Sequence, residues 1–274
     1  RALGLAVDFQ WMNRQMFYNS YQRVRGLFGN TDCEHEGLPG PQELKLLEPW
    51  RGRVPDAVFG PAYQPPRTDG ENSLRGNLRK AQELLRQAGW QVRDGALRNA
   101  QGEPMVLEYL DSNETGARVV TPWARNLEKL GIQLVFRPVD FALYQQRLQK
   151  FEFEVTTLAY AGTHTPGQEY ADLFGSKAAA TEDSGNHAGV RSPAVDAILD
   201  AMTGARTKEE LLPACRALDR VISHSHYLIP QWTAGTHRIA YNAWRLQPML
   251  PMPTYAGGEE WAIFTWWAKG QATH

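Results

Sequence analysis

The sequence predicts an α/β fold, because helical and strand-like segments alternate between residues 77 and 162. Leu78, Ala81 and Leu85 recur at helical spacing. Gly89 then follows as a residue suited to a left-handed helix C-cap. Two helical segments separate three short runs of strand-forming side chains, and this spacing favours a sheet with crossover connections. The three runs are VLEYL (106–110), IQLVF (132–136) and VTTLAY (155–160).

The two helices between these runs have their own start signals. Thr121 is suited to cap a helix that has Pro122 at its first position, and Gly131 would stop that helix. Asp140 is suited to cap the second, whose face would carry Tyr144 and, one turn later, a leucine and a phenylalanine.

The first quarter of the chain is less regular. Residues 1–27 are predicted to be a helix with large aromatic side chains. Residues 28–76 are rich in Gly and Pro and predict an ordered excursion over the surface, with one short helix around residues 42–47.

Two further helices are predicted after residue 191. Ser192 followed by proline begins the first, and Thr207 with Glu210 forms a capping box for the second. Pro213 removes a backbone hydrogen bond from the second helix, so we expect a bend or a late start there. The buried stripe of the second helix is predicted to contain Leu211, Cys215, Leu218 and Ile222.

Several long segments resemble the C-terminal lobe of family 5 extracytoplasmic solute-binding proteins, the oligopeptide and dipeptide receptors of ABC importers. They are KAQELLRQAGW, DGALRNAQGEPMVLEY, LEKLGIQLVFRPVDFALYQQRLQKFEFEV and NHAGVRSPAVDAILDAM. A narrower resemblance is to the YejA branch, which is linked to uptake of peptides and of peptide-nucleotide antibiotics of the microcin C type. It is carried by GLPGPQELKLLEPWRGRVPDAVFGPAYQPP, by SPAVDAILDAMTGARTKEELLPACRALDRVISHSHYLIPQW and by EEWAIFTWWA.

This resemblance implies an α/β fold of a particular kind: the C-terminal lobe of a type II periplasmic-binding-protein-like fold, with a mixed sheet flanked by helices. We expect residues 1–240 to form the lobe. Residues 241–274 would be a tail that either crosses toward an N-terminal lobe or folds back on its own lobe. Because residues 1–21 resemble a helix from well inside family polypeptides, we expect a fragment whose export signal lies upstream. A periplasmic location is implied.

Composition excludes some classes of partner. The formal net charge is −1, so nothing favours binding to nucleic acid or to anionic lipid, which would require a basic face. No run approaches the roughly 18 consecutive apolar residues that a membrane span needs. We therefore expect no nucleic-acid partner and no membrane insertion.

Motifs for catalysis or cofactor binding are not found. CEHE (33–36) crowds metal-compatible atoms into four consecutive residues, so we interpret it as a surface loop and expect no metal site. No nucleophile elbow, phosphate-binding loop or dinucleotide fingerprint is present, and no cofactor is expected. Cys33 and Cys215 could form a disulfide in an oxidising compartment, or Cys215 could be a buried free thiol.

The resemblance also indicates where a ligand would bind. In related dipeptide and oligopeptide receptors, a tryptophan and then an Asp-Tyr pair that grips the ligand's amino terminus occupy the segment matching LAYAGTHTPGQEY. Gly162 stands about where that Asp would be. Glu169 is the nearest acid that could replace it, with His164 and Gln168 as neutral hydrogen-bonding neighbours. Each of the three could instead be an exposed loop residue.

Four other residues complete the predicted site. Asn186 and His187 begin a stretch that matches a family loop facing the cleft. Tyr160 and Trp232 are aromatic candidates for the cleft wall, although Trp232 could equally belong to the core.

The predicted function is therefore that of a non-enzymatic binding lobe. It would serve the substrate-binding component of an ABC importer, which captures peptides or peptide-like compounds and delivers them to permease subunits. An alternative is a signalling or chaperone-like peptide-binding module, because the fold does not determine which partner protein binds it. A hydrolase with paired carboxylates is a weaker third interpretation, since no spacing singles out one acid pair.

Overall fold

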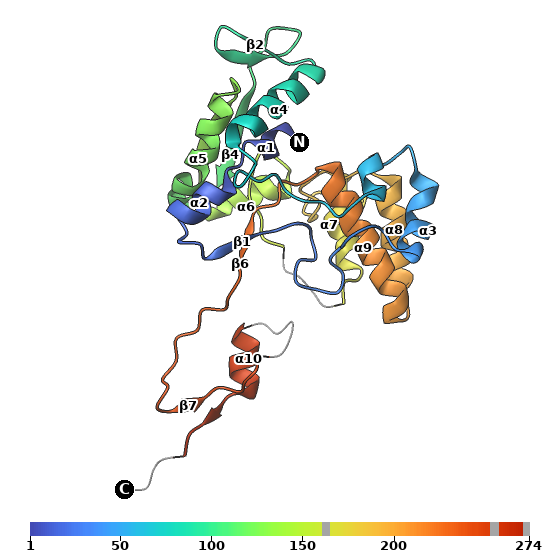
Figure 1. The fold of residues 1–274 in the computed structure, drawn as a ribbon, viewed down its shortest axis with the longest axis vertical. Coiled ribbons are helices and arrows are strands. Elements are labelled where there is room, and N and C mark those ends of the chain that lie inside the picture. The colour runs from blue at the N-terminus through green and yellow to red at the C-terminus, as the bar shows by residue number, and fades with distance from the viewer. Residues whose placement is uncertain (161–164, 253–257, 271–274) are drawn as a thin grey trace.

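A computed structural model describes residues 1–160, 165–252 and 258–270 of the chain. Figure 1 shows two units side by side, an α/β unit and a helical unit, and a C-terminal tail that extends away from both. The chain passes between the units several times, and strands β1 and β6 lie where the tail departs.

The α/β unit contains two parallel strands and the helices that connect and cover them. β4 pairs with β5 in parallel register, from Val106 opposite Gln133 to Asp111 opposite Pro138. At Gly131, which has a φ of +77°, an added Cβ would lie 2.6 Å from the Leu97 nitrogen, so this turn needs glycine. The elements are α4 (Leu74–Gln87), β2 (Gln91–Arg93), β3 (Ala96–Arg98), β4 (Val106–Asp111), α5 (Ala117–Glu128), β5 (Gln133–Pro138) and α6 (Phe141–Gln149).

Two predictions about this unit are wrong. α5 begins at Ala117, with Pro122 inside it, rather than at Thr121. The reason is that Asn113 caps a preceding 3-10 turn, η3 (Glu114–Gly116), by accepting a hydrogen bond from the Thr115 nitrogen at 2.9 Å, which starts the helical path earlier. VTTLAY forms no continuous strand, and only Val155 bridges β4, at Tyr109.

The helical unit has the largest hydrophobic core. Its elements are α3 (Pro41–Leu47), the 3-10 turns η1 (Glu48–Trp50), η2 (Asp56–Phe59) and η4 (Ala178–Ala180), α7 (Glu169–Phe174), α8 (Pro193–Gly204) and α9 (Lys208–Ser225). Ser192 and Thr207 cap α8 and α9 as predicted. α9 starts directly after Thr207 with Pro213 inside it, so a late start is wrong. The predicted stripe is confirmed, since Leu211, Cys215, Leu218 and Ile222 are all buried.

Residues 1–27 are not a single helix as predicted. They form α1 (Ala2–Leu5), α2 (Phe9–Gln15) and β1 (Tyr21–Arg23). α1 ends at Leu5, and Asp8 starts the second helix, because its side chain accepts a hydrogen bond from the Trp11 nitrogen. Tyr18 and Asn19 have positive φ angles, which end helical geometry before β1. β1 then pairs antiparallel with β6 (Trp232–Ala234).

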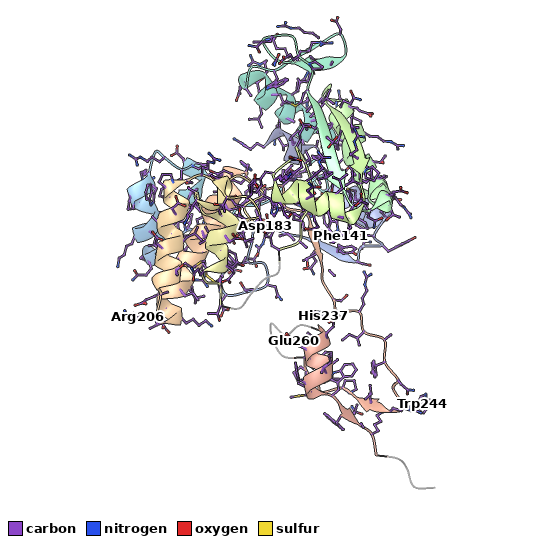
Figure 2. All side chains as sticks on the ribbon, turned by 180° about the vertical axis from the view of Figure 1, so that it is seen from behind. Phe141, Asp183, Arg206, His237, Trp244 and Glu260 are labelled. Atoms are coloured by element: carbon purple, nitrogen blue, oxygen red, sulfur yellow. A yellow bond between two sulfur atoms is a disulfide. The ribbon has the colours of Figure 1, made fainter. Side chains whose placement is uncertain are left out.

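The tail contains β7 (Leu246–Gln247), α10 (Gly258–Thr265) and β8 (Trp267–Ala268). Trp266 packs edge-on against Tyr241 and Trp261, with ring centroids 4.7 and 5.0 Å apart. Trp244 and Phe264 nevertheless remain 90% and 80% exposed. Figures 1 and 2 place the described tail residues, Trp244 among them, away from both units, so they do not fold back on the lobe in this structure. The domain boundary at residue 240 stays a prediction.

Candidate functional site

The carboxyl ends of β4 and β5 define one edge of the α/β unit. β4 ends at Asp111 and β5 at Pro138, and the parallel bridge at Val155 runs in the same direction. In open α/β sheets, ligands bind outside the carboxyl ends of the strands. The chain directly after Val155, which leads to Tyr160, therefore leaves the sheet at the edge where a ligand site is expected.

Side-chain hydrogen bonds hold residues 155–160 against the sheet although they form no strand. The Tyr109 and Thr157 hydroxyls lie 2.5 Å apart, and the Tyr144 and Thr156 hydroxyls 3.2 Å apart. Thr156 Oγ1 also donates to the Leu110 carbonyl at 3.1 Å. These contacts fix the direction in which the chain approaches the predicted site.

Tyr160 is partly buried against the helical unit. Its ring centroid lies 5.7 Å from that of Phe174, on α7, and burial raises the pKa of its phenol. Its ring therefore lies where the chain following the sheet contacts the helical unit. The structure does not test whether it also walls a cleft, and His164 lies outside the described residues.

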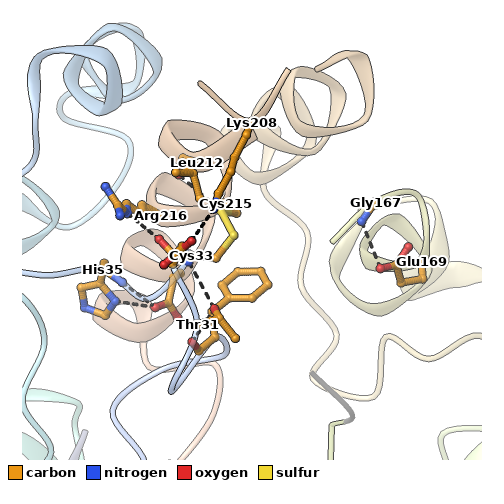
Figure 3. Close-up of a disulfide and its surroundings, with 12 residues drawn as sticks. Thr31, Cys33, His35, Gly167, Glu169, Lys208, Leu212, Cys215 and Arg216 are labelled. Atoms are coloured by element: carbon orange, nitrogen blue, oxygen red, sulfur yellow. Dashed lines mark hydrogen bonds and ion pairs between the residues drawn. A yellow bond between two sulfur atoms is a disulfide. The ribbon is translucent and has the colours of Figure 1, made fainter. Parts of the chain in front are cut away.

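Gln168 and Glu169 lie exposed at the start of α7. Glu169 Oε1 accepts a hydrogen bond from the Gly167 nitrogen at 3.0 Å (Figure 3). Glu169 is thus an exposed acid at the start of α7. Its role in ligand binding stays a prediction.

Asn186 is held within the helical unit, whereas the His187 ring lies against Phe151 and Phe153, with ring centroids 6.2 and 6.1 Å away. The Asn186 side chain is buried, donates to the carbonyls of Gly175 and Val190, and accepts from the Val190 nitrogen, all at 2.9 to 3.0 Å. His187 Nδ1 lies 2.9 Å from the Gly185 carbonyl. The hydrogen-bonding capacity of Asn186 is therefore used to shape its own loop, whereas His187 is only partly buried.

Trp232 belongs to a cluster of aromatic rings on the β1–β6 ribbon. Its ring centroid lies 6.2 Å from that of Phe9 and 5.1 Å from that of Phe17. Phe17 in turn packs edge-on against Tyr21 at 5.0 Å. Arg23 lies opposite Trp232 in the ribbon register, and its guanidinium carbon is 5.5 Å from the Phe9 ring centroid. Sequence reasoning singled out Trp232 but not Arg23.

The prediction that CEHE is a surface loop is wrong. His35 is buried and its Nδ1 lies 2.6 Å from the carboxylate of Asp219, on α9 (Figure 3). The same carboxylate accepts hydrogen bonds from the backbone nitrogens of Leu27 and His35. His35 Nε2 accepts from the Tyr63 nitrogen, so the ring proton sits on Nδ1 and the imidazole is neutral. His35 and Asp219 thus form a structural pair rather than a metal site.

A disulfide joins Cys33 to Cys215 beside that pair (Figure 3). Lys208 Nζ also contacts the Asp32 carboxylate at 2.6 Å, and Arg216 donates to the Asp32 carbonyl at 2.8 Å. The open question about the two cysteines is therefore decided in favour of a bond. Within the described ranges, no group of three or more His, Cys, Asp or Glu side chains could hold a metal ion.

Across the part of the chain that the structure describes, no helix combines the length and apolar character needed to cross a bilayer.

Comparison with protein families gives one extended match. The model of the family described as "Bacterial extracellular solute-binding proteins, family 5 Middle" matches residues 1–182. These residues include β4 and β5, which form the parallel pair. They also include β1 and the first residues of the predicted site.

Curated relatives match almost the whole chain. The "Probable peptide-binding protein YejA" of Agrobacterium fabrum is 36% identical over 269 residues, which cover 98% of this chain and 43% of the relative. The "Uncharacterized protein YejA" of Escherichia coli K12 is 33% identical, with 97% and 43% covered. The "Peptidoglycan-binding protein YepA" of Agrobacterium fabrum is 28% identical, with 97% and 42% covered. The chain spans less than half the length of these relatives.

Solved structures share the fold. The oligopeptide-binding protein AppA of Bacillus subtilis, in complex with a nonapeptide, has a TM-score of 0.64 at 14% identity, with 98% of this chain and 47% of AppA covered. A periplasmic oligopeptide-binding protein of Thermotoga maritima has a TM-score of 0.65 at 17% identity, with 98% and 49% covered. At such identities the likeness shows the fold alone, and it confirms the predicted α/β lobe.

Proposed function

Because the chain belongs to family 5 of the bacterial extracellular solute-binding proteins, as the sequence resemblance predicted, we propose that it supplies one lobe of a two-lobed peptide receptor. The ligand would be held between the lobes without chemical change. Family membership places the chain among binding proteins rather than enzymes.

The family match over residues 1–182 carries this proposal. That span contains the sheet edge at Asp111 and Pro138 and most of the aromatic cluster around Phe9 and Phe17. A peptide receptor needs backbone or polar groups for the peptide amides and aromatic walls for varied side chains. Polar and aromatic groups are both present in this span, and Figure 2 shows Phe141 and Asp183 on the side of the two units that faces the tail.

The exposed tail supports the two-lobe arrangement. Large apolar side chains such as Trp244, Leu250 and Phe264 are more than two thirds exposed on an arm that leaves the lobe. An apolar surface of that kind marks a protein contact. In the proposal these side chains pack against a second lobe, and hinge closure of the two lobes encloses the ligand.

The partners and location follow from the same proposal. The closed receptor would deliver peptides to the permease subunits of an ABC importer in the periplasm. Peptide-like compounds of the microcin C type are included in the proposed ligand class, on the resemblance to the YejA branch. Growth inhibition by such a compound should fall when the receptor gene is deleted, and unchanged inhibition would remove this ligand from the proposal.

Calorimetry with peptide mixtures tests the peptide-binding proposal directly. The complete receptor should bind peptides, while this chain alone should bind them far more weakly, since one lobe supplies only part of the contacts. Micromolar or tighter binding by the isolated chain would contradict the two-lobe arrangement. Failure of the complete receptor to bind any peptide would contradict the proposed function.

A further inference from the structure

Arg23 has the least satisfied charged side chain in the part of the chain that the structure describes. Its Nε and Nη1 are buried without a hydrogen-bond partner among the described residues. A buried ionised group normally has a charged or hydrogen-bonding partner, because desolvation without one costs several kcal/mol. The guanidinium instead lies over the Phe9 ring, a contact that cannot satisfy its N–H groups.

Other groups around Arg23 are donors or cations rather than acids. The Tyr63 hydroxyl and the His226 ring make no hydrogen bond among the described residues, and their rings lie 5.7 Å apart. The positive charges of Arg23 and Arg1 both act on the Tyr63 phenol. Burial and, to a smaller extent, positively charged neighbours lower the pKa of His226 to about 4.

The electrostatics of this region therefore favour an anion. Burial also lowers the pKa of Arg23 to about 10, which still leaves the guanidinium charged at neutral pH. The residue as a whole is partly buried on the β1–β6 ribbon, while its Nε and Nη1 are buried. Trp232, a sequence candidate for either the cleft wall or the core, is its register partner.

We propose that Arg23, assisted by the Tyr63 hydroxyl, binds a carboxylate group of the peptide ligand. The inference rests on the proposed function and deepens it by naming a feature of the ligand. A planar guanidinium is suited to a carboxylate, which it can bind through two parallel hydrogen bonds. The aromatic cluster beside it would cover the adjoining side chains of the peptide.

The carboxylate could belong to the peptide's C-terminus or to an acidic side chain, so the experiment separates the two. The complete receptor is titrated by calorimetry with a peptide that it binds, with the C-terminally amidated form of that peptide, and with a form in which Asp and Glu are replaced by Asn and Gln. One of the two neutralised peptides should bind more weakly, by about 10- to 100-fold, the loss expected for a charged hydrogen-bonded contact.

Arg23→Met should abolish the difference in affinity between the parent peptide and the neutralised form that binds more weakly. It should do so by weakening the binding of the parent peptide only. Arg51→Met is a matched control, because Arg51 also lies over a ring, that of Phe59 at 3.8 Å, but has an ionic partner in Glu48. The control should leave the difference intact. If Arg23→Met does not fold, as judged by thermal melting, Arg23→Lys keeps the charge without the two-pronged geometry and should reduce the difference.

Two results would overturn the inference. Neither neutralised peptide would bind more weakly than the parent, or the difference would persist in the Arg23 variants, whether or not Arg23→Met also lowers the melting temperature of the receptor. In both cases the receptor still binds peptide, so the proposed function stands. A receptor that binds no peptide at all fails at the earlier step.

Discussion

Breaking the Cys33–Cys215 disulfide should destabilise the lobe more than any other single covalent change. The two cysteines are separated by 182 residues, so the bond closes most of the chain into one loop. Loop-closure entropy for that length gives about 5 kcal/mol at 25 °C, and measured values for native disulfides fall between about 2 and 5 kcal/mol. Because both cysteines are buried in the helical core, repacking around alanine adds to the loss. We expect the Cys33→Ala/Cys215→Ala variant to lose roughly 3 to 5 kcal/mol.

Urea denaturation followed by tryptophan fluorescence measures this loss. Cys33→Ala and Cys215→Ala each remove the same bond, so either single variant, kept in reductant, should lose nearly as much as the double variant. The unfolded wild type should show no reaction with a thiol reagent. A loss below about 1 kcal/mol in the double variant, or two reactive thiols in the wild type, would refute the reasoning.

Three further predictions concern the buried groups near α9. Asp219→Ala should lower the free energy of unfolding by about 3 to 5 kcal/mol, because three buried hydrogen-bond donors lose their acceptor. Asp200→Ala, at an exposed position, is the control. Equal losses in the two variants would contradict the role of Asp219 as a buried acceptor. Gly26→Ala should be destabilising, because the added Cβ would clash with an Asp219 oxygen, whereas the Cβ of Gly29→Ala would enter open space. Similar melting temperatures of the two variants would contradict this packing of Gly26. Burial lowers the pKa of His224 from 6.5 to about 4. Its stabilising contribution is therefore complete above pH 6.5 and is lost as the pH falls toward 4, because the unfolded state binds the proton first. The slope of roughly 1 kcal/mol per pH unit should be smaller in His224→Gln, and an unchanged slope in urea denaturation would contradict the assignment.

Local signals in the sequence were sufficient for much of the fold. Ser192 and Thr207 begin helices where their hydroxyls predicted, because capping depends on residues within one turn. β4 and β5 formed from short runs of strand-forming residues, and their parallel pairing followed from the helix between them.

Elements that depend on distant partners were not predictable from local patterns. β1 is a strand because Tyr21 to Arg23 meet Trp232 to Ala234, about two hundred residues later in the chain. His35 can be buried because it hydrogen-bonds to Asp219, and nothing in the sequence near CEHE indicates that Asp219 is its partner. An informative signal was available at the other end, since Asp219 interrupts the apolar stripe of α9, where an unpaired acid would be costly.

The same distinction between local signals and distant contacts applies to the candidate site. Resemblance to a family singled out residues between 160 and 187 as candidates for the site, and their role in binding stays a prediction. It did not reveal that the Asn186 amide is occupied by its own loop, or that Arg23 lies unpaired beside Trp232. Both depend on hydrogen bonds that only the folded chain defines.

Hydrogen–deuterium exchange of the complete receptor with and without a bound peptide tests the central claim most directly. If this chain forms one wall of a peptide-binding cleft, peptide should slow exchange in residues 155–175 and in both strands of the β1–β6 ribbon, while the far face of α8 stays unchanged. Protection confined to the outer helices, or none in this chain while peptide is demonstrably bound, would contradict the account.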